Sequence, residues 1–171
     1  ATAVPDGRVL RITAPKGAIA CRGIVQGKPP SSDFTVVTKF CGCNYWGNYA
    51  KTGLLISESL TGKQLGIWHA YDSGWKGLMG EFFNSPTSRS SFSYYGPAVL
   101  PSGGYIKARV YYTTAWYVDF YYSSNGYTWI LAKSALALGF TPAYVGLGLD
   151  FEISTGTTYD AVYDWFRCTQ I

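Results

Sequence analysis

Two acidic residues near the end of the chain are the clearest candidates for catalysis. Asp150 and Glu152 are separated by one residue, so an extended strand places both carboxylates on the same face. A retaining glycoside hydrolase needs two such groups about 5 Å apart, one as nucleophile and one as acid and base. Position 154 is a serine, however, and ends the acidic alternation. We therefore expect an outer face or a cross-strand ion pair here, and we predict that the protein is not an enzyme.

The single histidine and the four cysteines limit the other chemistries. A Ser–His–Asp triad would have to use His69, and no nucleophile elbow surrounds that residue. A zinc site would need Cys21 and Cys168 to join the Cys41–Cys43 segment in the fold. Disulfides in an oxidising compartment and free thiols elsewhere are the alternatives, and four cysteines allow three pairings. We predict no catalytic residue, no metal and no cofactor.

Aromatic residues are the most abundant groups with a potential binding function. The sequence contains 15 Tyr, 9 Phe and 6 Trp. Flat aromatic rings complement the C–H faces of sugars, and Tyr and Trp add a hydrogen-bond donor. Some of these side chains alternate outward from predicted strands and others lie in predicted loops, although loops that fold over a sheet would turn them into a second core. The candidate ligand-binding residues are Trp46, Trp68, Trp75, Phe83, Tyr94, Tyr117, Tyr121, Asp150 and Glu152.

The charge pattern argues against nucleic acid and membrane as partners. The formal net charge is +4, but no two lysine or arginine residues are adjacent, whereas nucleic-acid binders concentrate them on one face or in a run. The sequence has no run of about 20 apolar residues, the length that a membrane helix needs. Residues Ala1–Arg11 lack the apolar core of a signal peptide. We expect neither nucleic-acid binding nor membrane insertion.

An alternation of apolar and polar residues with period two recurs along the whole chain and predicts strands. Asn125-Gly126 supplies the positive φ angles of a tight hairpin turn. Residues 14–32 and Ser85–Ser93 are expected to be mainly loop, with a short strand near Ile19, and Lys133–Leu138 to form a helical turn. The expected strands are Arg8–Thr13, Asp33–Gly42, Thr52–Glu58, Lys63–Tyr71, Lys76–Asn84, Tyr105–Tyr112, Ala115–Tyr122, Ala143–Ile153 and Tyr159–Thr169.

Regular strands separated by turns predict an all-β fold in which two antiparallel sheets share one core. Six segments occur in an order that resembles the concanavalin A-like lectin/glucanase superfamily, whose fold is a jelly-roll sandwich. We expect one domain over residues 1–171, with residues 1–32 partly an N-terminal extension. The segments are Asp33–Val37, Gly53–Ser57, Asn84–Ser88, Tyr121–Trp129, Ala143–Leu149 and Tyr159–Arg167.

The resemblance is strongest for compact modules of bacterial secreted proteins and bacteriophage virion proteins. It implies a non-catalytic, lectin-like module at the cell exterior or on a virion surface, which binds a glycan or a host-surface polysaccharide. The first alternative is an assembly domain of a phage head or tail protein, which contacts other virion proteins or forms a homo-oligomer. The second is a glycan hydrolase. The glucanase members carry three alternating acidic residues on one strand, and Ser154 breaks that pattern here.

Overall fold

The computed structural model describes residues 2–6, 9–15, 21–43, 49–72, 74–96, 103–151 and 158–170. These residues form thirteen strands, and no helix long and apolar enough to cross a membrane occurs among them. The strands are β1 (Thr2–Asp6), β2 (Val9–Pro15), β3 (Arg22–Gly27), β4 (Phe34–Cys43), β5 (Ala50–Ser57), β6 (Gln64–Asp72), β7 (Trp75–Ser85), β8 (Ser88–Tyr95), β9 (Gly104–Tyr112), β10 (Trp116–Ser123), β11 (Ile130–Ala137), β12 (Tyr144–Phe151) and β13 (Thr158–Gln170).

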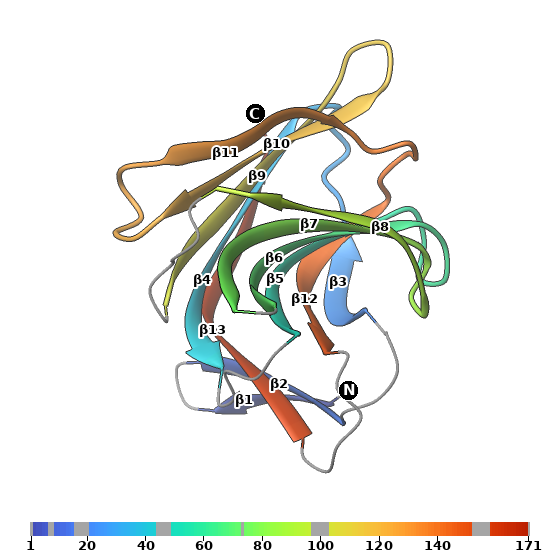
Figure 1. Cartoon of the computed structure of the whole chain (residues 1–171). Coiled ribbons are helices and arrows are strands. Elements are labelled where there is room, and N and C mark those ends of the chain that lie inside the picture. The colour runs from blue at the N-terminus through green and yellow to red at the C-terminus, as the bar shows by residue number, and fades with distance from the viewer. Residues whose placement is uncertain are drawn as a thin grey trace.

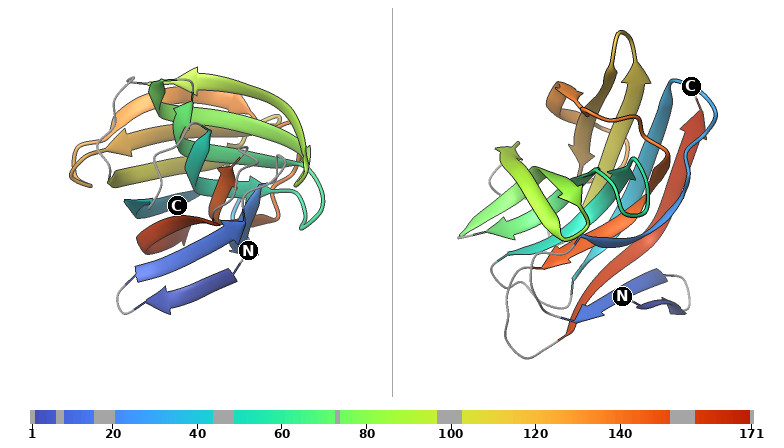
Figure 2. Two further views of the ribbon diagram at one scale, coloured as in Figure 1. Left: turned by 60° about the horizontal axis from the view of Figure 1, so that its bottom comes forward. Right: turned by 90° about the vertical axis from the view of Figure 1, so that its right-hand side faces the viewer.

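The strands form two antiparallel sheets. The seven-stranded sheet has the order β1-β2-β13-β4-β9-β10-β11, and the six-stranded sheet has the order β3-β12-β5-β6-β7-β8. Figure 1 shows β5, β6 and β7 bent into arcs, and Figure 2 shows β1 and β2 continuing the seven-stranded sheet beyond β13. The predicted all-β jelly-roll sandwich of concanavalin A-like type is confirmed.

Apolar side chains from the two facing surfaces fill the space between the sheets. The alternation of each strand explains which residues enter this core, since Leu54 and Ile56 of β5 point inward while Lys51 and Leu55 do not. A second, smaller apolar cluster lies on the outer face of the six-stranded sheet. It consists of Cys21, Leu55, Trp68, Ala70, Met79 and Phe83, with Val25 and Trp75 packed against it.

The phenol of Tyr163 connects the two sheets through the core. Tyr163 lies on β13 of the seven-stranded sheet and is fully buried. Its hydroxyl donates to the carbonyl of Gly148 on β12. It accepts from the backbone N–H of Gly53 at 2.9 Å and from the Thr52 hydroxyl at 2.7 Å. A polar group in the core is thus satisfied by buried backbone groups and one side-chain hydroxyl of the opposite sheet.

All nine strands predicted from alternation are present within a few residues of their expected bounds. The loop expected at Ser85–Ser93 was wrong, because Ser88–Tyr95 forms edge strand β8, whose mostly exposed faces need no apolar alternation. The helical turn at Lys133–Leu138 was also wrong. This segment belongs to β11, where Ala135 has a φ of 49° and its N–H donates to the Asp119 carboxylate at 2.7 Å.

The N-terminal part of the chain contributes to both sheets. β1 and β2 belong to the seven-stranded sheet and β3 belongs to the six-stranded sheet. The described part of residues 1–32 is therefore built into the sandwich. The short strand expected near Ile19 falls outside the described residues.

Candidate functional site

Three charged side chains are fully buried on the outer face of the six-stranded sheet. Lys51 on β5 pairs in register with Asp150 on β12, and its Nζ lies 3.0 Å from Asp150 Oδ2. The same Nζ lies 3.0 Å from Glu81 Oε1 on β7. Buried charges are stable only when they are paired and hydrogen-bonded. We call Lys51, Glu81 and Asp150 the buried charge cluster.

Lys51 and Glu81 belong to strands that are not neighbours in the sheet. Across β6, Lys51 is opposite Ala70 and Glu81 is opposite Gly66, so the two residues differ by four positions along the strand. In a flat sheet this offset corresponds to about 13 Å along the strand direction. The long Lys51 side chain nonetheless reaches Glu81, on strands that Figure 1 shows bent into arcs.

The Trp68 indole lies flat against the same face of the sheet and joins the buried charge cluster. Its Nε1 donates to Glu81 Oε2 at 2.9 Å. A Cβ at position 66 would lie 1.9 Å from the Trp68 ring, so only glycine allows this close approach. Gly148 supports the far edge of the ring, where a Cβ would lie 3.0 Å away. The indole is therefore buried and packs on two glycines, and it does not form an exposed surface for a ligand.

Burial dominates the protonation chemistry of this face. It raises the pKa of Glu81 to about 7, with Lys51 acting in the opposite direction. Arg89 on β8 provides a further cation, since its Nη1 lies 3.2 Å from Glu81 Oε1. Burial, followed by the charges of Asp150 and Glu81, also raises the pKa of the Cys21 thiol. These groups form a nearly closed polar network, and none of the three charged side chains in the buried charge cluster is exposed to a ligand.

Beside this network, three aromatic side chains form a row at the β7–β8 edge. The ring centroids of Trp75 and Tyr94 are 4.5 Å apart, and those of Tyr94 and Phe92 are 5.6 Å apart. Tyr94 and Phe92 are each 44% exposed. The Arg89 guanidinium lies 5.2 Å from the Phe92 ring centre and links the row to Glu81. We call Trp75, Tyr94 and Phe92 the aromatic row.

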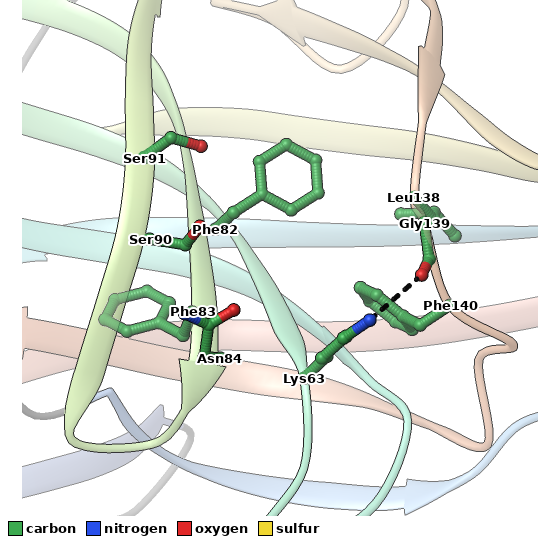
Figure 3. Close-up of a pocket in the computed structure, with 9 residues that line it drawn as sticks. All are labelled: Lys63, Phe82, Phe83, Asn84, Ser90, Ser91, Leu138, Gly139 and Phe140. Carbon is green, nitrogen blue, oxygen red and sulfur yellow. Dashed lines mark hydrogen bonds between the residues drawn. The ribbon is translucent and has the colours of Figure 1, made fainter.

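A pocket of about 180 Å³ lies on the other side of the β7–β8 hairpin (Figure 3). Ser90 and Ser91 of β8 stand on one side of it and the segment Leu138–Phe140 on the other. Lys63 points across its lower part, and its Nζ lies 3.5 Å from the Gly139 carbonyl oxygen. The pocket therefore offers hydroxyl groups, an ammonium group and aromatic walls.

The outer face of the seven-stranded sheet carries a different set of aromatic residues. The Tyr111 and Tyr117 rings stack with centroids 5.9 Å apart. The Lys107 ammonium lies 4.4 Å from the ring centre of Tyr121 and also 4.4 Å from that of Trp129. Burial between the two rings lowers the pKa of Lys107. This face thus holds its cations with aromatic rings rather than with buried carboxylates.

The structure divides the predicted site residues among separate regions. Trp75 and Tyr94 meet in the aromatic row, whereas Tyr117 and Tyr121 lie on the opposite sheet. The expectation that Trp68 and Phe83 point away from the core between the sheets is confirmed, because both belong to the outer cluster.

The prediction that Trp68, Phe83 and Asp150 contact a ligand is corrected, because all three side chains are buried. Trp68 and Phe83 lie in the outer apolar cluster, and Asp150 is paired with Lys51. Trp46 and Glu152 lie outside the described residues. Sequence reasoning missed Lys51, Glu81, Arg89 and Phe92, since a lysine alternating with apolar residues reads as solvent-facing and β8 was expected to be a loop.

The cysteines and possible metal ligands remain separate in the described part of the chain. Cys21 is a free, buried thiol, and Cys168 is a free thiol of intermediate burial. A pairing that uses either of them is therefore not present. Within the ranges that the structure describes, no three His, Cys, Asp or Glu side chains gather as a metal site would require.

Comparison with known proteins establishes the fold class. No protein-family model and no curated protein sequence matches the chain. A functionally unknown protein from Saccharomyces cerevisiae is 14% identical over 98% of this chain and 91% of its own, with a TM-score of 0.66. The GH43 protein BlXynB from Bacillus licheniformis is 17% identical with a TM-score of 0.65, covering 94% of this chain, which spans only 32% of that protein.

A legume lectin-like domain from Entamoeba histolytica is 12% identical over 99% of this chain and 87% of its own, with a TM-score of 0.55. Identities this low show the fold alone. The chain thus has a β-sandwich of the type found in lectin-like domains and in parts of glycoside hydrolases.

Proposed function

We propose that the protein is a non-catalytic carbohydrate-binding module, and that the aromatic row is its principal contact surface. The observation that carries this proposal is the continuous row Trp75–Tyr94–Phe92 beside Arg89, in which Tyr94 and Phe92 are exposed. Stacked sugar rings need flat aromatic faces with a polar group nearby to fix their orientation. The lectin-like neighbour with the same fold supports the assignment as an analogy.

The buried charge cluster favours binding over hydrolysis. Its two carboxylates share one ammonium group, and each has an oxygen 3.0 Å from Lys51 Nζ. Both carboxylates are buried and already paired with Lys51, and Glu81 also accepts from the Trp68 indole, so neither is available to a glycosidic oxygen in this arrangement. We expect no hydrolysis of the bound glycan, and Glu81→Gln should therefore leave product formation at the background level of the wild type.

Glycan binding is tested with the purified protein on an array of neutral and acidic oligosaccharides. Tyr94→Ala should weaken binding roughly tenfold, because the contact of one aromatic ring contributes about 0.5–1.5 kcal/mol beyond the apolar area that it buries, and about 1.4 kcal/mol is a tenfold change. Tyr127→Ala is the matched control, since this ring is 90% exposed in the β10–β11 connection. Equal binding by both variants, or no binding by the wild type, would refute the proposal.

One observation favours the assembly alternative as a second function. Ile130 and Leu131 are each 50% exposed on β11, which is an edge strand of the seven-stranded sheet. Exposed apolar residues on an unpaired edge favour protein–protein contact. In that case the module would dock on other surface or virion proteins, outside the cell or on a virion. Concentration-dependent oligomers that Leu131→Lys abolishes would support this function, and a monomer at all concentrations would argue against it.

A further inference from the structure

A second pocket opens on the outer face of the six-stranded sheet, between β3, β5 and β6. Its volume is about 170 Å³. A protein cavity of about 150 Å³ is large enough to admit benzene, so this pocket has room for one six-membered ring. The walls are formed by Val25, Leu55, Leu60 and Pro86.

Two buried polar side chains meet at this pocket. Ser57 and Gln64 are register partners on β5 and β6, and they are only 1% and 4% exposed. Among the described residues, neither Ser57 Oγ nor Gln64 Oε1 has a hydrogen-bond partner. An unpaired buried polar group is destabilising, so a ligand that offers hydroxyl groups would provide the missing partner for both. The combination of two polar atoms and apolar walls matches the two faces of a sugar ring.

The acceptor atoms of the pocket favour ligands that donate hydrogen bonds. Cys21 also lines the pocket, and burial raises the pKa of its thiol, which therefore stays neutral. Gln64 Oε1 is an acceptor and therefore requires a donor such as a neutral hydroxyl group.

We propose that this pocket is a subsite for one neutral sugar residue, which donates hydroxyl groups to Gln64 Oε1 and Ser57 Oγ and packs its C–H face on Leu55. The inference rests on the proposed function, because it places a second contact on the same outer face. The apolar cluster that contains Leu55 also contacts Trp75, so the pocket and the aromatic row lie at two ends of one surface. A bound oligosaccharide would insert one residue into the pocket and stack others along the row.

The test compares two buried serines. Ser57→Ala removes a hydroxyl that has no partner, and Ser123→Ala removes one that accepts from the backbone N–H of Gly126 at 2.8 Å. Binding of the methyl glycosides of glucose, galactose, mannose and xylose is measured by calorimetry or ligand-observed NMR, with glucuronic acid as the acidic probe. We expect at least one neutral glycoside to bind, Ser57→Ala to weaken it about tenfold, and glucuronic acid to bind no better than background.

Thermal unfolding of the same variants separates a ligand contact from a structural role. Ser57→Ala should leave the Tm unchanged or higher, because removing an unpaired buried hydroxyl is neutral or favourable, whereas Ser123→Ala should lower it. Gln64→Met, which keeps the side-chain length but removes the acceptor, should weaken the same glycoside.

Three results would overturn the inference. The first is an unchanged affinity of Ser57→Ala for the neutral glycoside, and the second is a decrease in Tm of Ser57→Ala equal to that of Ser123→Ala. The third is binding of glucuronic acid as tight as that of the neutral glycosides. If no monosaccharide binds but oligosaccharides bind and Tyr94→Ala abolishes that binding, only the subsite is refuted. If no oligosaccharide binds either, the proposed function fails with it.

Discussion

Lysine residues on the outer faces of the two sheets are held in contrasting ways. On the six-stranded sheet, Lys51 is completely buried between Glu81 and Asp150. On the seven-stranded sheet, Lys39 pairs with Asp164 while their side chains remain 36% and 31% exposed, and Lys107 lies between two aromatic rings. The first arrangement replaces water by fixed partners, and the second leaves water in place. The comparison shows that one face is a second core with a polar centre, whereas the other is a solvated surface.

The largest difference between the faces should appear when one lysine is removed from each. Lys51→Met removes the cation that two buried carboxylates share, so we expect a loss of about 3–5 kcal/mol in the free energy of unfolding. Lys39→Met removes a partly exposed ion pair and should cost less than about 1 kcal/mol. Urea denaturation of both variants gives the two values. Similar losses in the two proteins would show that the faces do not differ in this way.

The pH dependence of stability offers a second test, with two groups of opposite sign. Burial raises the pKa of Glu81 from 4.5 to about 7, so the folded state takes up a proton and stability falls as the pH rises across that range. Burial lowers the pKa of His69 from 6.5 to about 4, so stability falls as the pH decreases through that range. Each contribution is on the order of 3 kcal/mol. Between about pH 4.5 and 6.5 the two effects oppose one another.

Substitution at Glu81 separates these effects. In Glu81→Gln the contribution of His69 remains, and the free energy of unfolding should therefore decrease more steeply on acidification than in the wild type. His69 stacks on Phe40 between the sheets, with ring centroids 4.9 Å apart, so it is removed from the buried charge cluster. Denaturation curves recorded from pH 4 to pH 8 provide the measurement. A pH profile that Glu81→Gln does not alter would contradict the raised pKa of Glu81.

Tyr163→Phe should have an intermediate effect because it breaks the polar link between the two sheets. The hydroxyl of Tyr163 is bonded to Gly148, Gly53 and Thr52, and its removal leaves those groups without this partner. We expect a loss of about 1–3 kcal/mol. Hydrogen exchange should accelerate at Gly53, whose N–H donates to the phenol oxygen. Unchanged protection at Gly53 together with unchanged stability would show that the Tyr163 hydroxyl does not stabilise the packing of the two sheets.

The smallest effect is expected on the seven-stranded face. Lys107→Met keeps the apolar stem between Tyr121 and Trp129 but removes the ammonium group, which costs about 0.5–1 kcal/mol for an exposed cation–π contact. Chemical denaturation measures the change, and added salt should reduce it. A loss as large as that of Lys51→Met would mean that this face is also closed to water.

The sequence predicted the fold more fully than the site. Alternation identifies β5 and β12 because inward Leu54 and Leu147 recur with period two, and that period depends only on local geometry. The buried charge cluster joins residues of three strands, and Gly66 makes room for the Trp68 ring that is bonded to Glu81. Pairing of this kind across strands leaves no periodic pattern in the sequence. Exposure of Trp68 was therefore overestimated, and Glu81 could not be linked to Lys51 from residues thirty positions apart.

The position of β13 has a consequence for biosynthesis. This strand follows all the others in the chain, yet it lies inside the seven-stranded sheet between β2 and β4, where Ala161 pairs with Ile12. During translation, β2 and β4 emerge long before the strand that must separate them, and each has an unsatisfied edge until then. A ribosome-bound chain that lacks β13 cannot complete this sheet, so the last step of folding waits for late synthesis. We therefore expect chaperones that shield strand edges to bind the chain mainly in that interval.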